Sequence, residues 1–407
     1  MEYITVKQTA EKWSISTRRV QIFCSQGRIP GVYRFGKSWM IPADATLPSA
    51  LPREKGGALP LPRKSPFLNM TDLYTVPGTA EACIEALADH PEAQALFEAE
   101  IAYYRGDINT VLTHANDFLQ SSSGFYAVNA GGMLLALSAM WLGDISLYRR
   151  AKIHICEAPW RDTEQKQIMS LSLACVDSAV RDMSNYPEWF KRGQFEHLDP
   201  DSHPAAKVFY VKYLLIQAQE MAKGTLSLPD MTGLGLMRCI PYITEPLISR
   251  VVAERVIVPE IHLRLLVAVA YHQLGDDESA IMHIDKAITL ALPDRLFGIL
   301  AEYRRNFDNL LDDRLLLRDK EAYATTKELH KTLLASWTKL HNALNSKNIS
   351  TALTVREREI ARLAAFGLSN MEISKRLNIA VSTVRKIILT AMNKTGTEKR
   401  RELGAYV

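Results

Sequence analysis

One short stretch of the chain combines the residue types that bind a nucleotide phosphate. Residues Gly31 to Ser38, GVYRFGKS, fit the pattern G-x-x-x-x-G-K-[ST] at every fixed position. A phosphate-binding loop follows a buried strand and opens a helix whose N-terminal amides hold the phosphates. Here no apolar strand precedes the pattern, and Pro42 would obstruct the first turns of the helix. The residues on either side of Gly36 and Lys37 alternate in polarity, which favours a tight β-hairpin over an ATP site.

No other pattern in the sequence indicates catalysis or metal binding. The histidines His154, His262, His272 and His283 lack H-E-x-x-H or any other metal-ligand spacing, so we expect packing or surface roles for them. The five cysteines are scattered and form no C-x-x-C pair, which suits a reducing compartment better than a disulfide framework or a zinc site. The sequence therefore predicts a protein that is not an enzyme and that has no cofactor.

The charge of the chain is distributed unevenly along its 407 residues. Residues 1–65 carry a net charge of +7 and residues 352–407 carry +6, whereas the whole chain carries only +4. The middle is therefore acidic, with a net charge of −9. Two basic ends around an acidic middle indicate that the ends bind an anionic polymer.

The sequence predicts a cytoplasmic protein without a membrane anchor. The N-terminus lacks the basic, apolar and small-residue blocks of an export signal. The longest apolar stretch, residues 127–143, is interrupted by Asn129, glycines and Ser138, so we expect it to be too short and broken to span a bilayer.

The N-terminal segment has the pattern of two short helices followed by a hairpin. Residues 5–8, TVKQ, have capping-box form and predict a helix over 6–13, and Ser16 can cap a second helix over 17–26 that Gly27 ends. This arrangement, with YITVKQTAEKW, ISTRRV, GRIPG and GKSWMIP in order, resembles the excisionase-like, MerR-related winged-helix domains. The resemblance covers about 45 residues and implies a DNA-binding head over 1–46.

In such a head the second helix and the wing contact the duplex. We expect Trp39 to pack the wing onto the helices rather than contact bases. The resemblance and the exposed positions of the basic side chains predict DNA contacts for Arg18, Arg19, Gln21, Arg34 and Lys37.

The C-terminal segment carries a more specific pattern. Two capping boxes, TVRE at 354–357 and SNME at 369–372, each predict the start of a short helix, and Gly367 is expected to end the first of them. Three ordered blocks, LTVREREI, GLSNMEISKRL and STVRK, closely resemble the LuxR-type helix-turn-helix of transcriptional regulators. The resemblance covers about 55 residues and implies a DNA-binding head over 346–407, with a recognition helix over 381–393.

The resemblance to this family implies a set of DNA-facing positions in this sequence. Val384 is expected to pack inward, while its neighbours face the groove or its phosphates. The DNA-facing set is Ser369, Asn370, Lys375, Val381, Ser382, Thr383, Arg385 and Lys386. The sequence departs from the pattern at Ala380, Ile387 and Thr395, and its last helix is short, which puts the dimer contact of that helix in doubt.

Between the heads, the sequence predicts a linker and a helical body. Residues 47–70 are rich in proline and predict an extended linker. The pattern of residues 71–345 predicts helices throughout. A weak repeat consists of an apolar run, an aromatic residue and Gly-Asp, and its glycines are Gly106, Gly143 and Gly275. This repeat resembles a tetratricopeptide unit, which implies a stacked array with a surface for a peptide, protein or small-molecule effector.

The last part of the body, residues 320–344, reads as one long helix with leucines and Trp337 at steps of three and four. We expect it to cap the array, and a coiled-coil-like dimer contact is the alternative.

Together these features predict a mainly α protein that regulates transcription by binding double-stranded DNA, as a homodimer. Two alternatives stay open at this point. An architectural or recombination-directionality factor would bend DNA through the N-terminal head, and a pure interaction scaffold would not bind nucleic acid at all.

Overall fold

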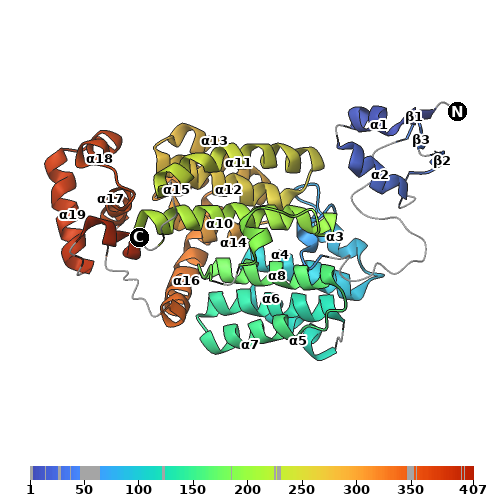
Figure 1. The fold of residues 1–407 in the computed structure, drawn as a ribbon, viewed down its shortest axis with the longest axis horizontal. Coiled ribbons are helices and arrows are strands. Elements are labelled where there is room, and N and C mark those ends of the chain that lie inside the picture. Colours follow the sequence, from blue (N-terminus) through green and yellow to red (C-terminus); the bar gives the residue numbers. More distant parts are fainter. Residues whose placement is uncertain are drawn as a thin grey trace.

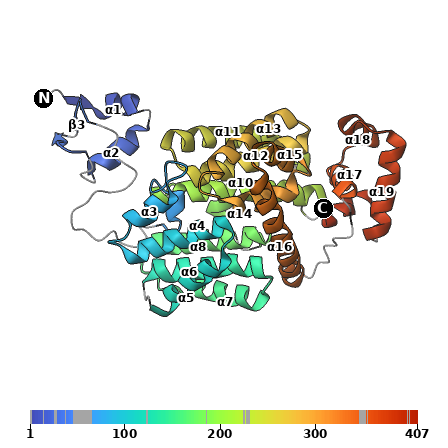
Figure 2. The same cartoon turned by 180° about the vertical axis from the view of Figure 1, so that it is seen from behind.

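The computed structural model describes residues 3–13, 15–25, 29–36, 38–45, 65–121, 124–184, 186–223, 226, 231–345, 353, 355–395, 397 and 399–407. A helical body occupies the centre of the molecule, and the two ends of the chain form small heads at opposite ends of its long axis (Figures 1 and 2). Helices dominate the described residues, as the sequence predicts.

The N-terminal head contains two helices and a small antiparallel sheet. Helix α1 covers Val6–Trp13 and α2 covers Thr17–Ser25, and the strands are β1 (Tyr3–Thr5), β2 (Tyr33–Phe35) and β3 (Ser38–Pro42). The strand order is β1-β3-β2. The capping box is present, since Thr5 and Gln8 exchange hydrogen bonds between backbone N–H groups and side chains. The strand β1 was not expected from the sequence.

The hairpin alternative to a phosphate loop is the one that forms. Ser38 begins strand β3 and not a helix, so no helix N-terminus is present to hold a phosphate. Gly36 turns the chain with a φ of 59°, a left-handed conformation that glycine adopts without strain. Trp39 is half-buried against the apolar core of the head, and the Arg34 guanidinium lies 5.6 Å from its ring. The packing role expected for Trp39 is therefore confirmed.

Most of the expected linker lies outside the described residues, which resume at Ser65. The last part of the expected linker, residues 65–70, belongs instead to the body. Ser65, Phe67 and Leu68 are buried, and the 3₁₀ helix η1 (Leu68–Met70) packs against α4. The buried Glu100 accepts hydrogen bonds from the backbone N–H groups of Leu68 and Asn69.

The body is built from pairs of antiparallel helices. Along the chain, these pairs include α4/α5, α6/α7, α10/α11 and α12/α13. The bounds of its helices are α3 (Ala80–Ala86), α4 (Pro91–Arg105), α5 (Ile108–Ser121), α6 (Phe125–Leu142), α7 (Ile145–Glu157), α8 (Thr163–Ala179), α9 (Glu188–Lys191), η2 (Pro200–Ser202), α10 (His203–Lys223), α11 (Gly233–Glu254), α12 (Ile257–Leu274), α13 (Asp277–Ala291), α14 (Phe297–Tyr303), η3 (Arg304–Asn306), α15 (Leu310–Arg318) and α16 (Lys320–Asn345).

The Gly-Asp repeat marks the turns of three of these pairs. Gly106, Gly143 and Gly275 end α4, α6 and α12 in the left-handed conformation, with φ of 84°, 64° and 94°. Asp144 and Asp276 then cap the following helices through their side chains. The turns predicted from the repeat are present, and the relationship to tetratricopeptide units stays a prediction.

Two long helices contribute buried apolar residues to the core of the body. Helix α6 alone among the described helices is long and apolar enough to cross a membrane, but 78% of it is buried inside the protein, as expected of a core helix. Helix α16 buries Leu333, Trp337 and Leu340 against the rest of the body. Because the Trp337 indole N–H donates to the Ala179 carbonyl, this face of α16 packs within one chain, as the capping interpretation expects.

The C-terminal head has its own apolar core. It consists of α17 (Val355–Ala365), α18 (Asn370–Leu377), α19 (Val381–Thr395) and the 3₁₀ helix η4 (Arg400–Tyr406). The predicted inward positions Ile360, Ile373 and Val384 are fully buried in this core. Gly367 has a φ of 91° and ends α17, as predicted. The predicted box around Thr354 lies outside the described residues.

Candidate nucleic-acid interface

Helix α19 presents one of its faces to solvent on the outer side of the C-terminal head (Figures 1 and 2). Val384, Ile388 and Ala391 recur at steps of three and four and are buried in the core of the head. This spacing turns the intervening side chains outward. The exposed set at the start of the helix is Val381, Ser382, Thr383, Arg385 and Lys386.

A capping box fixes the start of helix α18, which precedes α19. The Ser369 hydroxyl accepts from the Glu372 N–H at 3.2 Å, and the Glu372 carboxylate accepts from the Ser369 N–H at 2.6 Å. These hydrogen bonds to the charged form lower the pKa of Glu372. The capping box predicted at this position is confirmed. Asn378 then adopts a left-handed φ of 48°, and the chain turns into α19 within three residues.

The other predicted DNA-facing residues of this head differ in their surroundings. Ser369 and Lys375 are exposed, and Asn370 is half-buried. Among the described atoms, the side-chain oxygen of Asn370 is buried and has no hydrogen-bond partner. A DNA contact for these residues stays a prediction.

The N-terminal head agrees with its predicted set only in part. Arg18, Gln21 and Arg34 are exposed, and Lys37 lies outside the described residues. Arg19 differs from the prediction, because only 9% of it is exposed. Its guanidinium lies 3.9 Å from the Asp72 carboxylate of the body and 5.7 Å from the Phe23 ring. Burial lowers the pKa of Arg19, and the nearby Asp72 opposes this effect.

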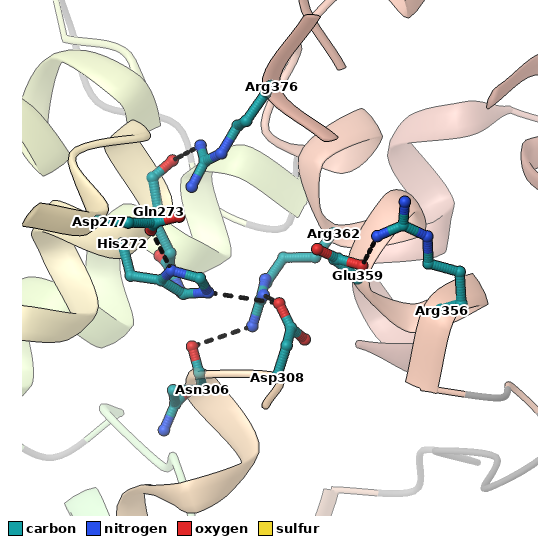
Figure 3. A network of polar contacts seen from close by, with 9 residues as sticks. All are labelled: His272, Gln273, Asp277, Asn306, Asp308, Arg356, Glu359, Arg362 and Arg376. Atoms are coloured by element: carbon teal, nitrogen blue, oxygen red, sulfur yellow. Dashed lines mark hydrogen bonds and ion pairs between the residues drawn. The ribbon is translucent and has the colours of Figure 1, made fainter. Parts of the chain in front are cut away.

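The C-terminal head docks onto the body through α17, α18 and η4, on the side away from the exposed face of α19, and η4 packs against α10. Arg362 of α17 forms an ion pair with Asp308 and donates a hydrogen bond to the Asn306 carbonyl at 3.1 Å (Figure 3). Arg376 of α18 donates to the Gln273 carbonyl at 2.9 Å. Arg376 comes so close to Gly275 that a Cβ atom there would lie 3.3 Å from the guanidinium.

His272 joins this junction from the body side. Its Nδ1 lies 2.6 Å from an Asp277 oxygen, and its Nε2 lies 3.3 Å from an Asp308 oxygen (Figure 3). Burial alone would lower the pKa of His272, but the hydrogen bonds to the two carboxylates outweigh it and raise the pKa. Burial would raise the pKa of Asp308, but Arg362 and His272 outweigh that effect and lower it.

The junction should therefore depend on pH. Because the folded-state pKa of His272 lies above its ordinary value near 6.5, the protonated ring stabilises the fold at pH below that value. This contribution is lost as the pH rises through the raised pKa. We expect the melting temperature to fall across this range in the wild-type protein and to fall less in His272→Gln. The exposed His154→Gln serves as the control, and an equal slope in all three proteins would contradict the assignment.

These docking residues were not predicted from the sequence. The pattern of α17 marks Arg362 as one of several charged side chains on a short helix, and Asp308 lies in a turn 54 positions away. A local feature that could have drawn attention to Asp308 is its left-handed φ of 52°, but this is visible only in the structure.

Comparison with known proteins supports the C-terminal head as the functional site. No curated protein and no solved structure shows a significant match to this chain. One protein family matches, with the description "Bacterial regulatory proteins, luxR family", over residues 351–407. The match covers the exposed face of α19 and the core that positions it. The C-terminal head is therefore a LuxR-type helix-turn-helix domain, which supports a DNA-binding transcriptional regulator rather than an enzyme.

Proposed function

We propose that the protein is a sequence-specific transcriptional regulator whose helix α19 reads the major groove of double-stranded DNA. The observation that carries this proposal is the family match over residues 351–407, together with the exposure of one face of α19. A helix of this size fits the major groove, where each base pair presents a distinct pattern of donors and acceptors.

The exposed face of α19 has the chemistry that such an interface needs. Arg385 and Lys386 can donate to guanine edges or to phosphates. Ser382 and Thr383 at the start of the helix add short hydroxyl donors, and Val381 adds an apolar surface for a thymine methyl group. All five side chains are exposed while the head is docked, so they are accessible in this arrangement.

The rest of the chain is assigned to regulation within this proposal. The helical body senses an effector, and the N-terminal head adds a second DNA contact through Arg18, Gln21 and Arg34. The protein acts in the cytoplasm. It acts as a homodimer, because a two-fold pair of recognition helices reads two half-sites one helical turn apart. This arrangement distinguishes a regulator from an architectural factor, which would depend on the N-terminal head alone.

The test is duplex binding by the full-length protein with Arg385 and Lys386 both replaced by alanine. Loss of affinity for a duplex that the wild-type protein selects from genomic fragments supports the proposal. Unchanged affinity would place the interface elsewhere, and absence of duplex binding by the wild-type protein at low salt would favour a scaffold that does not bind DNA.

A further inference from the structure

A cavity of about 110 Å³ lies in the body, lined by residues of several helices. Its apolar wall comes from α6, α10, α12 and α16. It contains Met140, Leu215, Leu266, Leu333 and Trp337. Its polar end contains Arg181, Gln219, Arg305 and Asn306. A cavity with an apolar wall and a few convergent polar groups is the usual form of a small-molecule site.

The charges around this cavity leave one cation without an anion. Lys212 also lines the cavity and lies close enough to Glu302 to oppose the rise in the pKa of that carboxyl, which burial causes. Arg181 forms an ion pair with Glu220 at 2.9 Å. For Arg305, no ion pair with a carboxylate is found among the described residues.

Arg305 is surrounded by other cations. Burial, together with the positive charges of Arg181, Arg358 and Arg362, lowers its pKa to about 9. The side chain is therefore still charged at neutral pH. This half-buried side chain carries its charge among other cations, where an anion would stabilise it.

The geometry of Arg305 suits a carboxylate. Its guanidinium lies 4.6 Å from the centre of the Trp337 ring. Stacking on an aromatic face leaves the N–H groups at the edge of the guanidinium plane available, and these match the two oxygens of a carboxylate. The neighbouring His330 donates from Nδ1 to the Ala301 carbonyl at 2.8 Å, and burial lowers its pKa to about 4, so it adds no positive charge.

The backbone conformation of Arg181 is a second observation that favours a binding site at the polar end of the cavity. Arg181 follows the last turn of α8 with a left-handed φ of 62°, at a position where helices usually have glycine. An arginine in this conformation is strained. Its Nη1 donates to Gln219 at 2.8 Å, while its Nε is buried without a hydrogen-bond partner among the described atoms. Strained residues with unused donors are typical of binding sites.

The polar end of the cavity is continuous with the junction to the C-terminal head. A second cavity of about 30 Å³ shares Arg181, Gln219, Arg305 and Asn306 with the first. Its other side is formed by the head, through Arg358, Arg362 and Phe366. Asn306 thus lines the first cavity and also accepts the hydrogen bond of Arg362 through its carbonyl.

We propose that this cavity binds a small organic monocarboxylate, and that its occupancy changes the docking of the C-terminal head. The carboxylate pairs with Arg305, and the apolar part of the ligand lies against Trp337 and Leu333. Movement of Arg305 and Asn306 on binding acts directly on the Asn306–Arg362 hydrogen bond. The site rests on the proposed sensing role of the body and names the chemical class of its effector.

The volume of the cavity limits the size of the ligand. An apolar protein cavity of about 150 Å³ holds one benzene molecule, so this cavity takes roughly four to six non-hydrogen atoms. Propanoate and 2-methylpropanoate are of this size and carry one carboxylate each. Their amides, propanamide and 2-methylpropanamide, have the same shape without the charge.

Ligand binding is tested on the full-length protein without DNA, by calorimetry and thermal melting. We expect at least one of the two carboxylates to bind with a Kd below 10 mM, on the order expected for such small ligands, and to raise the melting temperature by roughly 2–5 °C. Each amide should bind at least tenfold more weakly, as should inorganic phosphate. Equal binding of acid and amide, or no binding of either carboxylate, would overturn the proposal.

The variant Arg305→Met tests the role of the guanidinium. It should weaken carboxylate binding at least tenfold while the protein without ligand stays folded, because the substitution removes a charge that lies among other cations. The control is Arg295→Met, since Arg295 also lies over an aromatic ring, Phe297, but is exposed and outside the cavity. If Arg305→Met binds the carboxylate as tightly as Arg295→Met, the site is not at Arg305.

The link to the head is read by hydrogen–deuterium exchange, which needs no DNA. The bound carboxylate should change amide exchange in residues 305–308 and in α17, and the change should be absent in Arg305→Met. Unchanged exchange in α17 with the carboxylate bound would overturn the link. Because neither readout involves DNA, failure of DNA binding would be distinguished from failure of this site.

Discussion

Replacing Arg385 and Lys386 with alanine is expected to weaken binding to the selected duplex by roughly 30-fold or more, since each base or phosphate contact is worth about 1–3 kcal/mol. Both side chains are exposed on α19, beside the buried Val384 that fixes the helix in its head. Their removal disturbs no packing, so the fold should be kept. Fluorescence anisotropy with a labelled duplex, at two salt concentrations, measures the loss of affinity and the change in salt dependence.

A matched control separates a specific contact from the loss of two positive charges. Arg149 and Arg150 are also adjacent, exposed and on a helix, α7 of the body. Replacing both with alanine lowers the net charge equally and should change affinity less than threefold, because long-range charge effects are screened within about 10 Å at ordinary salt. If the two double variants lose affinity equally, the effect is one of net charge and not of α19.

Replacing Asp308 with asparagine is expected to destabilise the docked C-terminal head by roughly 3 kcal/mol. The carboxylate of Asp308 faces Arg362 and His272, and its side chain is only 13% exposed. Asparagine keeps the shape and tolerates the left-handed φ of 52° at this position, so the change acts through the charge. Removal of the carboxylate leaves the Arg362 guanidinium without its anionic partner in a buried junction.

The loss can be measured as a lower melting temperature and as faster amide exchange in α17. The control is Asp285→Asn, which removes a carboxylate that pairs with Arg314 and Arg318 on a more exposed surface. Ion pairs of this kind contribute about 1 kcal/mol or less. If Asp308→Asn is no more destabilising than Asp285→Asn, the Arg362–Asp308 pair does not hold the head to the body.

The features that the sequence predicted correctly are those that depend on neighbouring residues. The capping box at Ser369, the left-handed Gly367 and the spacing of Ile360, Ile373 and Val384 are set by residues within one or two helical turns. The same holds for Gly36 in the hairpin. Local patterns therefore predicted the helices of the C-terminal head and the inward and outward faces of α19.

The features that the sequence did not predict depend on residues far apart in the chain. Arg19 was expected to face DNA, but its position relative to Asp72 is decided by how the N-terminal head lies on the body. The same is true of Arg362 and Asp308. A charged residue on an amphipathic helix has the same local pattern whether it faces DNA, solvent or another part of the protein. Only the tertiary arrangement distinguishes these cases.

The most direct test of the account is photo-cross-linking of the full-length protein to the selected duplex from single positions. A benzophenone amino acid at Ser382 should cross-link to the duplex, whereas the same group at Arg149 on the body should not. A group at Arg18 reports separately on the N-terminal head. Cross-links from Ser382 that disappear with excess unlabelled duplex are the predicted result. Cross-links from Arg18 or Arg149 without any from Ser382 would contradict the assignment of α19 as the helix that reads DNA.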